Sequence, residues 1–137
     1  MTRQQILELI GQQGTPLDLE CVGVKYKFDF HCTPTTFDNR IVFELGRNDV
    51  DIPIVVDPQD GHIHFCDHKS LSFINSSFSQ MLRAFSYVNE WDIPDDLPDT
   101  ERASIFKTRM LEIDRNCFHD MDACWSTMQE EIEYGVI

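Results

Sequence analysis

Residues 70–91 constrain the fold more than any other part of the sequence. They open with a short apolar run at residues 71–74, which predicts a buried strand. Ser77 and Gln80 then form a Ser-x-x-Gln capping box, a signature of a helix start. Apolar residues follow at helical spacing: Phe78, Met81, Leu82, Phe85 and Val88. A helix with one apolar stripe must cover a flat apolar surface, and we expect the preceding strands to provide it.

Residues 17–30 predict a strand of an antiparallel sheet, because apolar and polar side chains alternate there. The side chains expected to face the core are Val22, Val24, Tyr26, Phe28 and Phe30. A loop is expected at residues 33–36, and further strands at residues 40–46, 51–57 and 62–67. Pro53 has no amide hydrogen to donate, so it is expected at an edge, a strand start or a bulge.

Three other helices are predicted from caps and apolar spacing. The first starts with a capping box formed by Thr2 and Gln5, and its apolar stripe is Ile6, Leu7 and Ile10. Another follows the connection at residues 92–99, with a cap near Asp99 or Thr100, and is expected to bury Ala103, Phe106, Met110 and Ile113. The last spans residues 122–134, ends at Gly135, and is expected to bury Met121, Trp125, Met128 and Ile132.

Strands grouped before helices predict an α+β domain instead of alternating strand–helix units. We expect a mostly antiparallel sheet of about five to six strands, covered by about four helices. The length of 137 residues favours one domain over residues 1–137. The apolar content of 42% is enough for a packed core.

The cysteine pattern and the absence of targeting signals predict a cytoplasmic protein. Five cysteines, an odd number without a Cys-x-x-Cys pair, favour free thiols in a reducing compartment. The first ten residues do not resemble a signal peptide, and no apolar run approaches the length of a membrane span. No membrane association is expected.

The charge predicts a basic partner. The sequence has 24 acidic and 11 basic residues, a net charge of −13. Residues 90–137 alone hold 13 acids and 4 bases. A negative field repels phosphate backbones, so direct nucleic-acid binding is not expected, whereas a basic protein would be attracted. The alternative is that the charge serves only solubility.

Two acidic groups are candidates for partner binding. The preferred one surrounds the connection before the third helix and consists of Glu90, Asp92, Asp95, Asp96 and Asp99. The second comprises Glu130, Glu131 and Glu133, which lie in the last turns of the final helix. The helix dipole disfavours negative charge there by about 0.3–1 kcal/mol each, and a basic partner would compensate for that cost. Alternatively, these glutamates simply point into water.

A histidine-rich segment at residues 62–68 raises the alternative of a metal site. On a strand, His62, His64 and Cys66 would share one face, a pattern found in zinc and copper sites, with Asp67 or His68 as a further ligand. Side chains two residues apart on a strand are about 6.5–7 Å apart, and no second Cys/His pair completes the site. We therefore favour a structural role, with no metal and no other cofactor. No nucleophile elbow or phosphate-binding loop is present, so an enzyme is not expected.

Three segments, in order, resemble the SUKH superfamily, particularly its SUKH-4 branch of immunity proteins. The central one is residues 73–77 (FINSS) followed by the apolar helix. Residues 54–57 (IVVD) and 60–63 (DGHI) resemble the strand, turn and strand upstream. Residues 124–126 (CWS), 130–132 (EEI) and Gly135 resemble the C-terminal helix, although Cys124 replaces the usual aromatic residue.

This resemblance implies an immunity protein of a bacterial polymorphic-toxin system. Such a protein would bind a cognate toxin domain and neutralise it by stoichiometric occlusion; the acidic charge suggests a basic toxin such as a nuclease or deaminase. The structural motif residues would be Asn75, Ser76, Ser77 and Trp125, with Asn75 bonding backbone groups at the strand-to-helix turn. The alternatives are an intracellular scaffold of the Smi1/Knr4 branch, or a small metal-binding protein that uses His62, His64 and Cys66.

Overall fold

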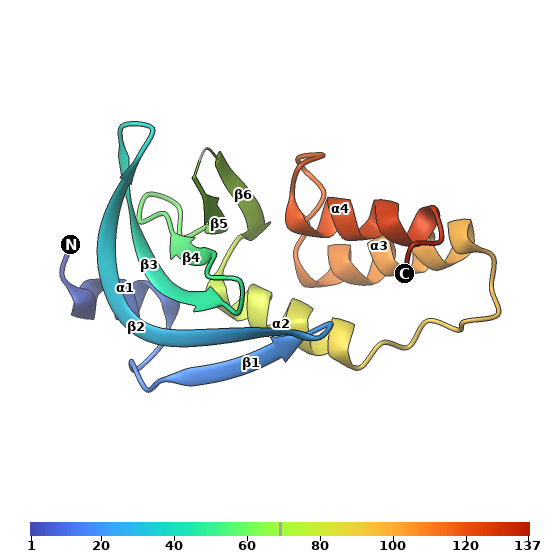
Figure 1. The fold of residues 1–137 in the computed structure, drawn as a ribbon, viewed down its shortest axis with the longest axis horizontal. Coiled ribbons are helices and arrows are strands. Elements are labelled where there is room, and N and C mark those ends of the chain that lie inside the picture. The colour runs from blue at the N-terminus through green and yellow to red at the C-terminus, as the bar shows by residue number, and fades with distance from the viewer. Residues whose placement is uncertain (69) are drawn as a thin grey trace.

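The sheet is a meander in which each strand pairs with its neighbours along the chain (Figure 1). The computed structural model describes residues 1–68 and 70–137, and within them six antiparallel strands form one curled sheet. The strands are β1 (Leu17–Cys21), β2 (Val24–Phe37), β3 (Arg40–Asn48), β4 (Pro53–Val56), β5 (Ile63–Asp67) and β6 (Ser70–Asn75). The predicted α+β fold with an antiparallel sheet is confirmed, and Pro53 opens its strand.

Four helices are present in the described residues: α1 (Arg3–Ile10), α2 (Phe78–Asn89), α3 (Asp99–Ile113) and α4 (Cys124–Glu133). Helices α1 and α2 pack on the sheet, and α3 and α4 form a pair beside it (Figure 1). Helix α2 contacts β1, β6 and α3, while α3 and α4 lie side by side and α4 reaches β6. One continuous core joins both parts, because Phe78 and Phe85 of α2 are buried together with Phe106 of α3 and Trp125 of α4.

The predicted strand at residues 17–30 is instead a hairpin. Cys21 pairs with Val24, so Val22 and Gly23 form a two-residue turn. Both turn residues have positive φ, 51° and 78°, which is the pattern of a type I′ turn. Val22 is therefore 57% exposed and does not face the core. The error arose because a two-residue turn leaves the alternation of apolar and polar residues unbroken on both sides.

The loop expected at residues 33–36 is part of β2. The register of β2 on β3 shifts between Phe28 and Thr33, and the irregularity contains Phe30 and Cys32, which have positive φ. Beyond this bulge β2 pairs only with β3, because β1 ends its pairing at Phe28. Pro34 is tolerated there because one side of the strand is an open edge.

Strand β3 contains a position that only glycine fits. Gly46 lies opposite Phe28 of β2, next to a register shift towards β4. A Cβ atom at Gly46 would lie 2.7 Å from the Phe28 Cα and closer still to the Lys27 carbonyl oxygen. The two backbones approach so closely here that the sheet has no room for a side chain.

The predicted helix starts are correct for α1 and partly correct for α2. In α1 the reciprocal capping box of Thr2 and Gln5 is present. At α2 the Ser77 hydroxyl accepts a hydrogen bond from the Gln80 amide at 3.1 Å, as expected. The Gln80 side chain does not complete the box; it donates to the Ile113 carbonyl of α3 at 3.3 Å. It thereby links two helices.

The starts of α3 and α4 differ from the predictions. Neither Asp99 nor Thr100 caps α3, since Pro98 occupies the cap position without a side-chain hydrogen bond. Helix α4 begins only at Cys124, so Met121 lies in the turn before it and is 87% exposed, not buried. The predicted end of α4 is confirmed: Gly135 has φ of 71° and donates to the Ile132 carbonyl.

Candidate functional site

A buried hydrogen-bond cluster joins β6 to the helical pair, and Asn75 is at its centre. Its Nδ2 donates to Asp114 Oδ2 at 3.0 Å, and its Oδ1 accepts from Trp125 Nε1 at 3.0 Å. Both Asn75 and Asp114 are buried. The motif residues Asn75 and Trp125, 50 residues apart, are thus brought together. Among the described residues the partners of the Asn75 side chain are side chains, so the expected bonds to the backbone are wrong.

Asp114 completes the cluster and was not anticipated from the sequence. It follows the last residue of α3, and its carboxylate accepts from the Ser76 amide at 2.7 Å, the Ser76 hydroxyl at 2.9 Å and the Asn116 amide at 3.0 Å. Burial alone would raise the pKa of Asp114, but these bonds and the one from Asn75 hold it below its ordinary value. The carboxylate is therefore ionised and fixes the strand-to-helix turn to the end of α3.

Replacing Asn75 with alanine is expected to lower the free energy of unfolding by about 2 kcal/mol. The change leaves the indole N–H of Trp125 without its partner and removes one donor from Asp114. Chemical denaturation measures the loss. Asn116→Ala is the matched control, because its exposed side-chain amide makes a single bond to the Ser76 hydroxyl, and it should cost less than about 1 kcal/mol. Equal losses for both variants would contradict a central role for Asn75.

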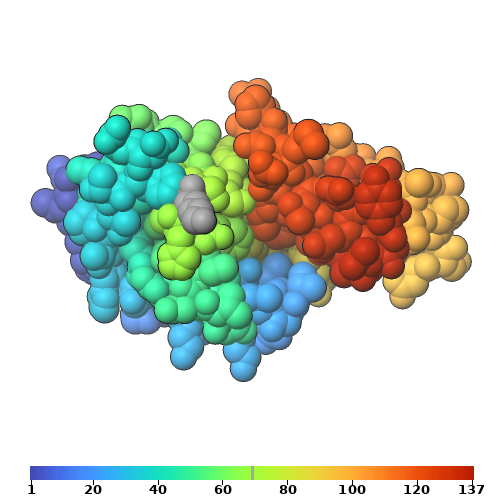
Figure 2. All heavy atoms as spheres, turned by 45° about the horizontal axis from the view of Figure 1, so that its top comes forward, coloured from blue at the N-terminus to red at the C-terminus, as the bar shows by residue number. Residues whose placement is uncertain are grey.

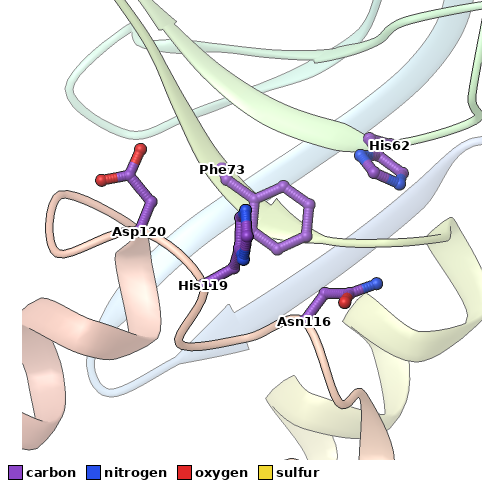
Figure 3. Close-up of a pocket in the computed structure, with 5 residues that line it drawn as sticks. All are labelled: His62, Phe73, Asn116, His119 and Asp120. Atoms are coloured by element: carbon purple, nitrogen blue, oxygen red, sulfur yellow. The ribbon is translucent and has the colours of Figure 1, made fainter.

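The histidine-rich segment borders a pocket of about 270 Å³ (Figure 3). His62 and Phe73 contribute to it from the sheet side, and Asn116, His119 and Asp120 from the connection between α3 and α4. Strand β5 begins after His62, and the Phe73 ring packs edge-on against both His62 and His64. Aromatic packing therefore accounts for the position of these two histidines.

The geometry of this segment does not favour the metal-binding alternative. The rings of His62 and His64 have centroids 6.4 Å apart, and His62 Nδ1 lies 3.2 Å from Asp60. Within residues 1–68 and 70–137 no three His, Cys, Asp or Glu side chains are grouped to hold a metal ion. Burial lowers the pKa of His64, so its ring is neutral at neutral pH.

The cysteine thiols are poorly suited to act as nucleophiles. Burial raises the pKa of Cys21 to about 11 and the pKa values of Cys117 and Cys124 to about 12. The thiolate is the reactive form, so these side chains are inert at neutral pH. Burial also raises the pKa values of Cys32 and Cys66.

The acidic candidates are all exposed, and the two segments that carry them approach each other where α3 starts and α4 ends (Figure 1). Glu90 ends α2, residues 92–98 form the connection, and Asp99 starts α3, next to the C-terminal end of α4 (Figure 1). A Cβ atom at Gly135 would lie 2.8 Å from the Asp99 carboxylate, so the last residue of the first acidic group adjoins the chain just after the second. We call this surface the acidic end; its members are Glu90, Asp92, Asp95, Asp96, Asp99, Glu130, Glu131 and Glu133.

Two arginines compensate for part of this charge. Arg102 lies 3.7 Å from Asp95 and 3.6 Å from Asp99, and Arg109 lies 3.6 Å from Asp92. The Tyr87 hydroxyl also donates to Asp92 at 2.9 Å. In the part of the chain that the structure describes, the other five members of the acidic end form no ion pair: Glu90, Asp96, Glu130, Glu131 and Glu133.

Comparison with known proteins leaves the family undecided. No protein-family model, curated protein or solved structure matches the chain. None of the helices in the described residues has the length and apolar character needed to cross a bilayer.

Proposed function

We propose that this protein is an immunity protein that binds a basic toxin domain stoichiometrically and neutralises it by occlusion. The observation that carries the proposal is the acidic end, a set of eight exposed carboxylates on two segments that approach each other at Asp99 and Gly135. The SUKH-4 likeness supports the class of protein, and two of its segments meet in the bond between Asn75 and Trp125. The proposal places the protein in the cytoplasm, where its free cysteines stay reduced.

The charge balance of the acidic end favours a basic partner. Exposed ion pairs contribute only about 0.2–1 kcal/mol each, so no single carboxylate is expected to dominate binding. Together they create a negative field that increases the rate of encounter with a positively charged surface. A toxin domain with exposed lysines and arginines would supply partners for the five carboxylates that lack an ion pair among the described residues.

The test is co-expression with candidate basic toxin domains, beginning with nucleases and deaminases, scored by survival of the host cell. For a toxin that is neutralised, Asp95→Lys combined with Asp96→Lys should weaken binding at least several-fold and reduce its salt dependence. The fold should remain intact, because Asp96 forms no ion pair among the described residues and Asp95 is 97% exposed.

The matched control reverses two exposed acids outside the acidic end, Asp18 and Asp122, whose side chains form no hydrogen bond or ion pair among the described residues. This variant has the same net charge as the double reversal at the acidic end. We expect it to protect like the unmodified protein. Equal weakening by both double variants would mean that net charge, and not the acidic end, governs binding. Survival with none of the toxins would contradict the proposed function.

A further inference from the structure

An apolar groove opens beside the acidic end. It has a volume of about 340 Å³ and lies between the β1–β2 turn, the end of α2, and the α3–α4 pair. The residues that line it include Val22, Gly23, Asn89, Trp91, Arg102 and Met128. Figure 2 shows the C-terminal residues, in red, beside the connection to α3, in yellow and orange. The size suits one or two side chains.

One wall of the groove is an exposed valine that weakens the fold. Val22 occupies the first position of a type I′ turn, where φ is 51° and where asparagine followed by glycine is preferred. A β-branched residue is an outlier in this left-handed region, which costs about 1–2 kcal/mol. Strained residues of this kind cluster at binding and active sites. The turn therefore presents an exposed apolar side chain at the rim of the groove, at a position where asparagine would fit the backbone better.

The opposite wall combines an aromatic ring with an arginine, and neighbouring side chains hold both. The Trp91 ring is half-buried, packs edge-on against Phe106 with centroids 5.8 Å apart, and lies 5.9 Å from the guanidinium carbon of Arg102. Arg102 is in turn held by Asp95 and Asp99. Tryptophan and arginine in a preformed hollow are typical of the residues that dominate protein interfaces. The groove thus needs little reorganisation to bind.

The surrounding charge identifies the occupant. Glu90 adjoins Trp91 in the sequence, and Asp95 and Asp99 contact Arg102 on the groove wall. An apolar side chain fits the lining, and positive charges on either side of it fit the rim. We propose that the groove receives an apolar side chain of a partner protein, flanked by lysines or arginines that pair with the acidic end. This inference rests on the proposed function and specifies how the toxin would be held.

The test uses the valine at the turn, because changes there do not threaten the fold. Val22→Asn should raise the melting temperature, because asparagine tolerates the positive φ better than valine. The same variant should weaken toxin binding about tenfold. Val22→Lys should weaken binding further, since it places a positive charge against the basic partner. Val50→Asn is the control: Val50 is 69% exposed in the β3–β4 connection, and binding should be unchanged.

The outcomes separate this inference from the proposed function. If a toxin is neutralised but both Val22 variants bind it like the unmodified protein, or no worse than Val50→Asn, the groove proposal is wrong and the immunity function stands. If no toxin is neutralised, the proposed function fails, and the groove is tested by nuclear magnetic resonance with the acetylated peptide Lys-Lys-Leu-Lys-Lys. The groove proposal would be supported by changes in the chemical shifts of the Trp91 indole and of the Val22, Gly23 and Asn89 amides. The control peptide Glu-Glu-Leu-Glu-Glu should cause no such changes. Absence of these changes with the lysine peptide would overturn the groove proposal.

Discussion

Asp114→Ala is expected to lower the free energy of unfolding by about 3–5 kcal/mol, a larger loss than for Asn75→Ala. The carboxylate accepts four hydrogen bonds, from the amides of Ser76 and Asn116, the Ser76 hydroxyl and the Asn75 side chain. Alanine would leave buried donors of Asn75 and Ser76 without a partner, at about 1–3 kcal/mol each. Equilibrium unfolding in urea measures the loss.

The isosteric variant Asp114→Asn separates charge from shape. It keeps one acceptor oxygen, so we expect about half the loss seen with alanine. Because the folded pKa of Asp114 lies below the ordinary value for an aspartate, its contribution to stability is complete above that ordinary value and disappears as the pH falls through the folded pKa. Stability of the asparagine variant should therefore depend less on pH in that acidic range. Unfolding curves of the alanine variant that match those of the unmodified protein would show that the cluster does not hold the helical pair.

Gly46→Ala is expected to destabilise the fold by about 3 kcal/mol or more, at the upper end of the range for overpacking. The added methyl group would meet the backbone of β2 at Lys27 and Phe28, and backbone atoms in the middle of a sheet cannot move aside as a flexible side chain can. The melting temperature and the urea midpoint should both fall.

Gly23→Ala provides the comparison for this effect. A Cβ atom at Gly23 meets nothing within 4 Å, so its only penalty is the positive φ of 78°, about 1 kcal/mol. A loss at Gly46 no larger than the loss at Gly23 would mean that β2 and β3 can separate locally at little cost.

Local periodicity made most of the elements predictable. The stripe of α2 is an example: Phe78, Met81, Phe85 and Val88 are buried as expected, because a helix that covers a sheet must repeat its apolar residues every three to four positions. The exposure of the acidic candidates also followed from the sequence. The sequence could not show that the start of α3 lies beside the end of α4, because that depends on how the two helices pack.

The buried cluster was only half predictable, for a physical reason. Asn75 was singled out by the SUKH-like motif at residues 73–77, but its partner Asp114 lies 39 residues further on, and no local rule links the two. A weak signal was present. Asp114 directly follows the apolar stripe of α3 and precedes Asn116, a spacing that allows an Asx turn, and the Asn116 amide does donate to its carboxylate.

The order of the strands in the sheet has a consequence for how the chain assembles. Since every strand pairs with its neighbour in sequence, the loops that must close are short and the sheet can form quickly, one hairpin after another. During synthesis, a ribosome that has delivered the chain as far as Asn75 has already delivered every described strand. The carboxylate that fixes the helical pair emerges 39 residues later. We therefore expect the sheet to assemble first, and the helical pair to dock on it only after Asp114 and then Trp125 have been synthesised.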